Sequence, residues 1–156
     1  MHQKLSIHEK APVIRSARLE DMAAILSLVK ELAEYERSPQ SVTATLETYQ
    51  EDFREGYFKA LVAELDGEIV GMALYYPVFS TWRGRMMYLE DFIVRETLRG
   101  SGIGKLLFDA FIEKAKLARS ILCKLQVLRW NEPAINFYKK YDVILDDEWV
   151  DVKLYF

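Results

Sequence analysis

A glycine-rich turn between an apolar strand and a helix is the feature that most constrains this chain. Residues 99–105 read Arg-Gly-Ser-Gly-Ile-Gly-Lys. Met86 to Val94 is an almost continuous apolar run typical of a strand, and apolar residues recur at helical spacing from Leu106 to Ala118. Glycines before a helix let successive N–H groups point into one concavity, where the helix dipole adds roughly half a positive charge. Such a turn favours phosphate oxygens.

The spacing within the turn excludes two common phosphate motifs. Gly100-x-Gly102-x-Gly104 lacks the spacing of the dinucleotide fingerprint. Gly104-Lys105 has no glycine five residues earlier and no following Ser or Thr, which an ATP-binding loop requires. Neither NAD nor an ATP loop is therefore indicated, and a purely structural turn is the alternative interpretation.

The remaining pattern alternates strands and helices without a repeat or linker. The dipeptide Asp66-Gly67 predicts a two-residue hairpin turn, and Thr43 is a candidate N-cap for a helix reaching about Phe53. The other predicted helices are Leu19–Ala33 and Asn131–Tyr141, and Ser80–Arg85 is predicted as a loop. The predicted strands besides Met86–Val94 are Val13–Ala17, Phe58–Leu65, Glu68–Phe79, a buried Ile121–Leu128, Val143–Leu145 and Trp149–Phe156.

Composition narrows the class of protein. The 156 residues suit one domain, predicted over residues 13–156 after a leader of residues 1–12. With 21 Lys plus Arg against 24 Asp plus Glu, the net charge of -3 argues against nucleic acid as a partner. The single Cys123, with His2 and His8 in the leader, predicts no metal site and a reducing compartment. The absence of a signal segment or membrane span predicts a cytoplasmic protein.

Three motifs occur in a fixed order along the chain. They are Tyr-Leu-Glu-Asp-Phe-Ile-Val at 88–94, Arg-x-x-Gly-x-Gly at 99–104 and Trp-Asn-Glu-Pro-Ala-Ile-Asn-Phe-Tyr-Lys at 130–139. Together they resemble the GNAT family of N-acetyltransferases, and within it the diamine (spermidine/spermine) N1-acetyltransferases and the thialysine acetyltransferases. The resemblance implies an α/β (α+β) fold whose mixed, mostly antiparallel central sheet is splayed at the cofactor site and flanked by about four helices.

The resemblance also implies acetyl-CoA as co-substrate, without a metal. The backbone of Phe92, Ile93 and Val94 is expected to hold the pantetheine arm where that strand splays from Leu122–Leu128. Asn131 and Ala134 match positions that line the same arm. The pyrophosphate is expected at Arg99, Gly100, Ser101, Gly102, Ile103, Gly104 and Lys105.

Two residues match the family's catalytic positions. An alkylamine is only about one part in a thousand neutral at pH 7, a deficit of roughly 4 kcal/mol, so a base helps. Glu90 matches that base, and the alternative is an ordinary solvent-facing carboxylate. Asp91 points to the opposite face if the strand is regular, so only one of the pair is expected to face the cleft. Tyr138 matches the acid that protonates the leaving thiolate, and aromatic packing is its alternative.

The acceptor side is less determined by the sequence. Tyr35, Glu36 and Trp82 are predicted to bind the acceptor amine together with Glu90, and ordinary surface positions are the alternative. Arg83 and Arg85 flank Trp82 and favour an acceptor that also carries a carboxylate, such as thialysine.

The prediction is direct acetyl transfer to a primary amine of a small molecule, a polyamine, a diamine or a thialysine-like amino acid, in a ternary complex. A non-catalytic acyl-CoA-binding regulatory module and a protein or peptide N-acetyltransferase are the alternatives. The resemblance implies a homodimer with the aromatic C-terminal strand at the interface, and a monomer with that strand buried internally is the alternative.

Overall fold

The computed structural model describes residues 10–156, which divide into one unit ending at Gln126 and a second comprising Val127–Phe156. The predictions for His2 and His8 lie outside the described residues. The first unit holds a five-stranded sheet in the order β1-β2-β3-β4-β5, antiparallel except for the parallel β4–β5 pair. Its strands are β1 Val13–Ser16, β2 Lys59–Leu65, β3 Glu68–Ser80, β4 Gly84–Val94 and β5 Leu122–Leu125.

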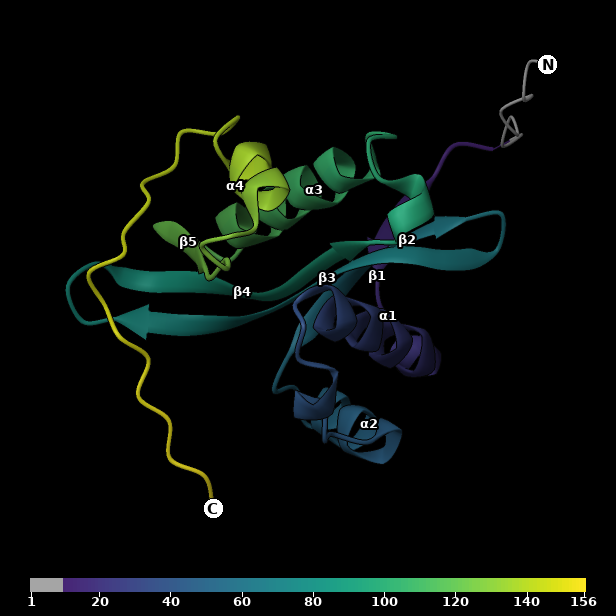
Figure 1. Ribbon diagram of the computed structural model, residues 1–156, viewed down its shortest axis with the longest axis horizontal. Helices are drawn as coiled ribbons and strands as arrows, with labels where there is room; N and C mark the ends of the chain where they lie inside the picture. The colour runs from purple at the N-terminus through teal and green to yellow at the C-terminus, as the bar shows by residue number, and fades with distance from the viewer. Residues whose placement is uncertain (1–9) are drawn as a thin grey trace. The chain divides into compact units, whose positions relative to one another are not determined.

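Helices cover both faces of this sheet. Figure 1 shows α1 and α2 on one face and α3 on the other. This arrangement and the mixed sheet confirm the predicted fold class. The helical elements of the first unit are η1 Leu19–Asp21, α1 Met22–Tyr35, η2 Pro39–Ser41, α2 Leu46–Glu55, η3 Glu96–Leu98 and α3 Ile103–Leu117.

The apolar core lies between the sheet and these helices. On the α1 face, fully buried Met22, Ile25 and Leu28 pack with strand residues such as Val62 and Met72. Each such side chain removed from water contributes roughly 1.5–3 kcal/mol.

On the α3 face, aromatic rings fill the space between helix and sheet. Tyr75 meets Phe111 with ring centroids 5.5 Å apart. Gly71 permits close approach of α3, because a Cβ there would lie 3.0 Å from Leu107 Cδ1 and 3.1 Å from the carbonyl oxygen of Ile93.

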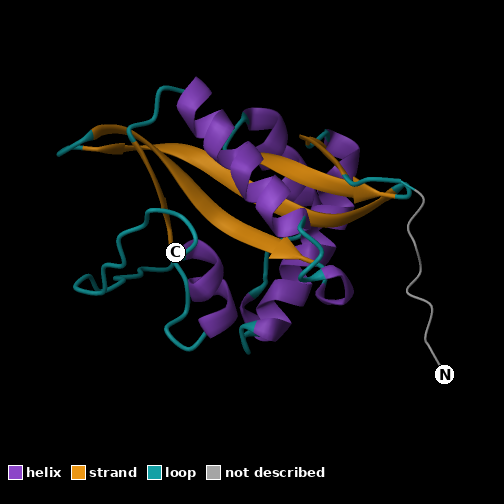
Figure 2. Ribbon diagram, turned by 90° about the horizontal axis from the view of Figure 1, so that it is seen from above, coloured by secondary structure: helices purple, strands orange, loops and turns teal. Residues whose placement is uncertain are grey.

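Two hairpins set the register of the sheet. The predicted turn at Asp66-Gly67 is confirmed, with φ angles of 51° and 82° that match the twist of the flanking strands. The β3–β4 hairpin continues to Ser80↔Gly84, so the predicted loop at Ser80–Arg85 is shorter than expected. Figures 1 and 2 show its tip projecting beyond α1, α2 and α3.

A charged network ties β1 to the start of α1. Arg15 donates to both carboxylate oxygens of buried Asp21, at 2.7 and 3.0 Å, and to Glu64 at 2.9 Å. Hydrogen bonding to Arg15 holds the pKa of Asp21 below its usual value despite burial. A buried carboxylate is tolerated here because several donors replace its water.

The predicted N-cap of the second helix was wrong by two residues. Pro39–Ser41 forms a short 3-10 turn, and α2 begins only at Leu46. Thr45 has the extended backbone of a cap, and its hydroxyl accepts from the backbone N–H of Thr48 at 3.2 Å.

Three strand predictions near the C-terminus also require correction. The strand predicted as buried over Ile121–Leu128 is only β5, whose four residues are half-buried or exposed because it forms the sheet edge. Cys123 is accordingly exposed rather than buried. Val143–Leu145 and Trp149–Phe156 form no strand, because nothing within residues 10–156 pairs with them; Figure 2 draws this segment as loop.

The second unit contains one helix, α4, at Glu132–Tyr138. It is shorter than the predicted Asn131–Tyr141, but its start is as expected. Asn131 is the N-cap, its side-chain oxygen accepts from the N–H of Ala134 at 3.3 Å, and Pro133 lies in the first turn. Within residues 10–156, no helix is long and apolar enough to cross a membrane.

Candidate active site

An irregularity in β4 determines where its two carboxylates lie. Leu74 pairs with Asp91 and Tyr75 with Leu89, so Glu90 is an extra residue in β4, a β-bulge. The bulge breaks the alternation of faces. Both carboxylates act electrostatically on the same two phenols, those of Tyr49 and Tyr76. The expectation that only one of the pair faces a given cleft is therefore corrected, because it assumed a regular strand.

Asp91 is the more enclosed of the two carboxyl groups. Burial raises its pKa to about 6, and the charges of Glu90 and Glu36 add to the effect. Burial also raises the pKa of Glu36, at the C-terminal end of α1. Glu36, Glu90 and Asp91 form what we call the acidic cluster, and no Lys or Arg within residues 10–156 makes an ion pair with it. The cluster can stabilise a cation that enters it.

Phenols surround the acidic cluster. The Tyr76 hydroxyl donates to Glu90 Oε2 at 2.7 Å. Tyr49, on α2, has its pKa raised to about 12 by burial and by the charges of Asp91 and Glu90. These rings leave the cluster bordered by aromatic surface, which suits the methylene groups and the charge of an alkylammonium ion.

The pairing of β4 with β5 ends before the acidic cluster. The parallel pairing with β5 covers Met86–Leu89 and ends at Leu89↔Leu125. The backbone of Phe92, Ile93 and Val94 therefore has no β5 partner on that side, as the predicted splay requires. Apart from the Val94 carbonyl, which accepts a hydrogen bond from Arg99, main-chain groups of this part of β4 can bind an amide-containing arm.

The glycine turn has the geometry of an anion site. Gly100 and Gly102 have φ angles of 77° and 90°, and Gly102 is the N-cap of the 15-residue α3. No described side chain caps this helix; the Ser101 hydroxyl donates instead to the Leu98 carbonyl. The first N–H groups of α3 thus lack a side-chain acceptor, and nothing lies within 4 Å of a Cβ built at either glycine. These features fit a pyrophosphate.

The remaining residues of the turn contribute differently. Ile103 is buried, so its side chain is not available to a ligand. Gly104 lies in the first turn of α3. Lys105 forms an exposed ion pair with Asp109. An exposed pair contributes little stability, so the Lys105 ammonium group can exchange Asp109 for a phosphate with a small loss of free energy.

Arg99 joins the turn to the predicted acceptor residues. Its Nε donates to the Val94 carbonyl at 3.2 Å, and its guanidinium carbon lies 4.7 Å from the ring centroid of Tyr35. Tyr35 precedes Glu36 of the acidic cluster. The structure thus brings residues predicted for the donor side and residues predicted for the acceptor side to one end of β4.

Trp82 lies far from the other residues predicted to bind the acceptor in the same chain. It lies at the tip of the β3–β4 hairpin, 82% exposed. Glu90 is six residues from the first residue of β4, Gly84, which is about 20 Å at the rise of a strand.

Asn131, Ala134 and Tyr138 belong to the second unit. Asn131 and Ala134 form the N-cap hydrogen bond of α4, and Tyr138 lies at its last position with its ring 5.4 Å from that of Phe137. Their predicted roles stay predictions.

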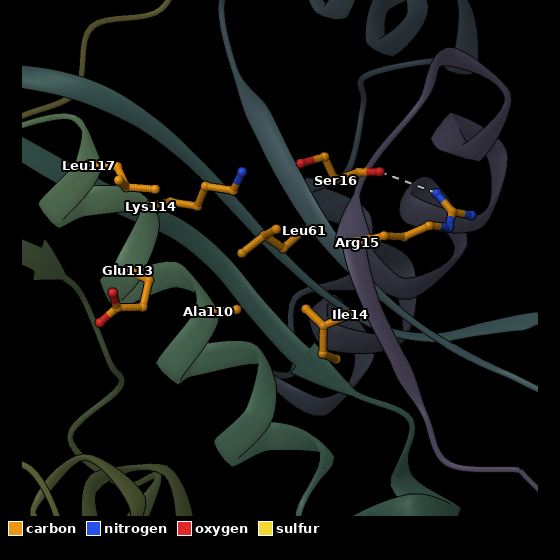
Figure 3. Close-up of a pocket in the computed structure, with 8 residues that line it drawn as sticks. All are labelled: Ile14, Arg15, Ser16, Leu61, Ala110, Glu113, Lys114 and Leu117. Carbon is orange, nitrogen blue, oxygen red and sulfur yellow. Dashed lines mark hydrogen bonds between the residues drawn. The ribbon is translucent and has the colours of Figure 1, made fainter.

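A groove of about 370 Å³ elsewhere in the first unit contains none of the predicted residues (Figure 3). The Arg15 side chain points away from Lys114 there, consistent with its contacts to Asp21 and Glu64. The groove is lined by Ile14, Arg15, Ser16, Leu61, Ala110, Glu113, Lys114 and Leu117. Among residues 10–156, no group of three or more His, Cys, Asp or Glu is arranged to hold a metal ion.

Sequence reasoning missed Asp91, Tyr76 and Tyr49 as site residues. The bulge that turns Asp91 to the site has no glycine to signal it, and Tyr49 reaches the cluster through tertiary packing. The Tyr75-Tyr76 pair was visible, but only the structure shows which ring meets Glu90.

Comparison with known proteins identifies the family. The model of the acetyltransferase (GNAT) family matches residues 22–142. Thialysine N-epsilon-acetyltransferase of Mus musculus is 40% identical over 136 residues, covering 81% of this chain and 80% of that protein. Spermidine/spermine N(1)-acetyltransferase-like protein 1 of Homo sapiens is 31% identical over 137 residues, covering 80% of this chain but 19% of that longer protein.

A solved structure confirms the fold. The crystal structure of a predicted acetyltransferase with acetyl-CoA from Clostridium acetobutylicum superposes with a TM-score of 0.76 at 20% identity, covering 92% of this chain and 96% of that one. The match of sheet, helices and motif order leaves one assignment. This chain belongs to the GNAT family of acetyltransferases.

Proposed function

We propose that this acetyltransferase moves the acetyl group of acetyl-CoA directly to a primary amine of a small molecule, in a ternary complex. The observation that carries the proposal is the acidic cluster, three carboxyl groups without an ion-pair partner in the described chain, beside the part of β4 that does not pair with β5. An ammonium ion is the ligand that such a cluster stabilises.

Glu90 is the proposed base. Bound acetyl-CoA supplies a thioester carbon for attack by the amine nitrogen. The cationic amine must first lose a proton, at a cost of roughly 4 kcal/mol at pH 7. Glu90 is exposed, holds one hydrogen bond through Oε2, and is positioned to take that proton directly or through a water. The negative charge of Asp91 and Glu36 attracts the same cation.

The remaining roles follow the family resemblance. Tyr138 donates a proton to the leaving thiolate. The backbone of Phe92, Ile93 and Val94, together with Asn131 and Ala134, lines the pantetheine arm. The pyrophosphate is held by Arg99, Gly100, Ser101, Gly102, Ile103, Gly104 and Lys105.

The proposed acceptor is a polyamine, a diamine or a thialysine-like amino acid. The names of the two relatives cover both kinds of amine. Tyr35, Glu36 and Glu90 are proposed to bind it. Trp82 contacts it only if the acceptor is long or if a second copy brings its hairpin tip near. Arg83 and Arg85 beside Trp82 favour an acceptor with a carboxylate.

We propose a cytoplasmic homodimer as the working form. Apolar residues of Trp149–Phe156 are strongly exposed, Val152 at 93% and Leu154 at 80%, and a patch of this kind favours association. A reducing compartment keeps the exposed thiol of Cys123 free.

The test is thiol release from acetyl-CoA with spermidine, putrescine, lysine, thialysine and a lysine peptide. Glu90→Gln and Tyr138→Phe are each expected to reduce turnover of one small amine at least about tenfold, roughly 1.4 kcal/mol in the barrier. Glu55→Gln is the matched control, because this exposed carboxylate lies at the end of α2 outside the site.

Two outcomes would contradict the proposal. Acetyl-CoA binding without turnover of any amine would favour an acyl-CoA-binding regulatory module. If the lysine peptide is acetylated and short amines do not inhibit that reaction, a protein N-acetyltransferase would be favoured.

A further inference from the structure

Tyr76 is the residue in direct contact with Glu90. Its hydroxyl donates to Glu90 Oε2 at 2.7 Å, a normal length for a phenol and a carboxylate. Tyr76 lies on β3 and Glu90 on β4, so the bond crosses between neighbouring strands. No described residue donates to Oε1, which leaves that oxygen available to a substrate.

The ring of Tyr76 is itself fixed. It pairs directly across the sheet with Tyr88, and the two rings stack with centroids 5.5 Å apart and an interplanar angle of 27°. Burial and the hydrogen bond to Glu90 raise the pKa of Tyr76 well above its usual value. The phenol therefore stays protonated, and remains a donor, throughout the pH range in which an acetyltransferase works.

Glu90 needs such a partner because of its place in the strand. As the extra residue of a β-bulge it is exposed and has no ladder neighbour to confine it. A free glutamate side chain loses roughly 1.5–2 kcal/mol of rotamer entropy when it is fixed. A donor on a rigid ring can fix the carboxylate before the substrate arrives.

We propose that Tyr76 is a positioning residue, which holds Oε2 of Glu90 so that Oε1 faces the amine and accepts its proton. This inference rests on the proposed function, in which Glu90 is the base. Tyr76 does not touch the reacting atoms and acts only through Glu90.

The test is Tyr76→Phe, which removes the hydroxyl and keeps the ring that stacks on Tyr88. We expect kcat for the small amine to fall about tenfold, while KM for acetyl-CoA stays within about twofold. In the Glu90→Gln background the same change should cause no further loss of kcat, because the group that it positions is gone.

Tyr75→Phe is the matched control. Tyr75 is the next residue, but its ring packs against Phe111 on the opposite face of the sheet. It should leave kcat unchanged. A melting temperature for Tyr76→Phe close to that of the wild type would show that the fold is intact, and crystals of Tyr76→Phe should show Glu90 in more than one rotamer.

The outcomes separate this inference from the function on which it rests. If the wild type acetylates no small amine, the proposed function fails and the inference with it. If the wild type is active but Tyr76→Phe behaves like Tyr75→Phe, or loses activity additively with Glu90→Gln, only the positioning role is overturned.

Discussion

The surroundings of Asp91 raise the pKa of its carboxyl group. Its carboxyl group is largely removed from water and faces Glu90 and Glu36, so its pKa rises to about 6. A group placed in this way destabilises its own ionised form. The arrangement is unfavourable to the empty fold and favourable to a bound cation, which is common at ligand sites.

This burial predicts a pH dependence of stability. An unfolded aspartate titrates near pH 3.9, so between about pH 4 and pH 6 the folded chain keeps a proton that the unfolded chain has lost. The stability contributed by Asp91 is therefore fully present below pH 4 and decreases as the pH rises to about 6. Asp91→Asn should gain up to roughly 3 kcal/mol over the wild type as the pH rises from 4 to 7.

Urea unfolding at a series of pH values measures this gain. Asp142→Asn is the control, because Asp142 is exposed in the second unit and is not part of the acidic cluster. A difference for Asp91→Asn that does not change with pH would contradict the account of Asp91.

At the residue scale, the sequence was a better guide to which residues are candidates for the site than to the direction in which their side chains point. The proposed role of Glu90 comes from a distinctive motif and stays a prediction. The orientation of Asp91 depends on a bulge, which is set by how β3 and β4 pair and not by the residues of β4 alone. The hydrogen bond from Tyr76 to Glu90 depends on the same pairing, so it could not be predicted from the sequence either.

At the scale of elements, the glycine turn connects backbone geometry to cofactor binding. Gly102 has a φ of 90°, which costs a residue with a Cβ about 1–2 kcal/mol. Gly102→Ala should lower stability by that amount and raise KM for acetyl-CoA at least about fivefold, because the first N–H groups of α3 turn out of line.

Gly56→Ala separates these two effects. Gly56 ends α2 with a φ of 80°, and a Cβ there also meets nothing within 4 Å. It should lose similar stability and leave KM for acetyl-CoA unchanged. Equal KM values for the two variants and the wild type would show that the turn is only structural.

The corrected start of α2 gives a second test at this scale. Thr45→Ala removes the hydroxyl that accepts from the N–H of Thr48 and should cost about 1 kcal/mol. Thr43→Ala should cost less than about 0.5 kcal/mol, as expected of a surface position. Urea midpoints measured with an unchanged m-value decide between them, and the reverse order would return the cap to Thr43.

Elements with local signals were predictable and those that depend on partners were not. The Asp66-Gly67 hairpin and the Asn131 cap are each determined by a few adjacent residues, and both were predicted correctly. Trp149–Phe156 has the composition of a strand, but a strand forms only when another segment supplies the ladder of hydrogen bonds.

At the scale of the whole molecule, the exposed apolar C-terminal residues predict self-association. Sedimentation equilibrium at micromolar concentration should give about twice the chain mass of 18.2 kDa. A chain ending at Glu148, which lacks Trp149–Phe156, should sediment as the monomer. A full-length chain of about 18 kDa at that concentration would contradict the homodimer.

The most direct test of the central claim is to identify the product. The enzyme is incubated with acetyl-CoA and each small amine in turn, and N-acetylated amine and released thiol are quantified together. The account predicts one acetylated amine per thiol for at least one small primary amine, no thiol release without amine, and at least about tenfold less product with Glu90→Gln. Acetyl-CoA binding with no acetylated amine from any of them would contradict it.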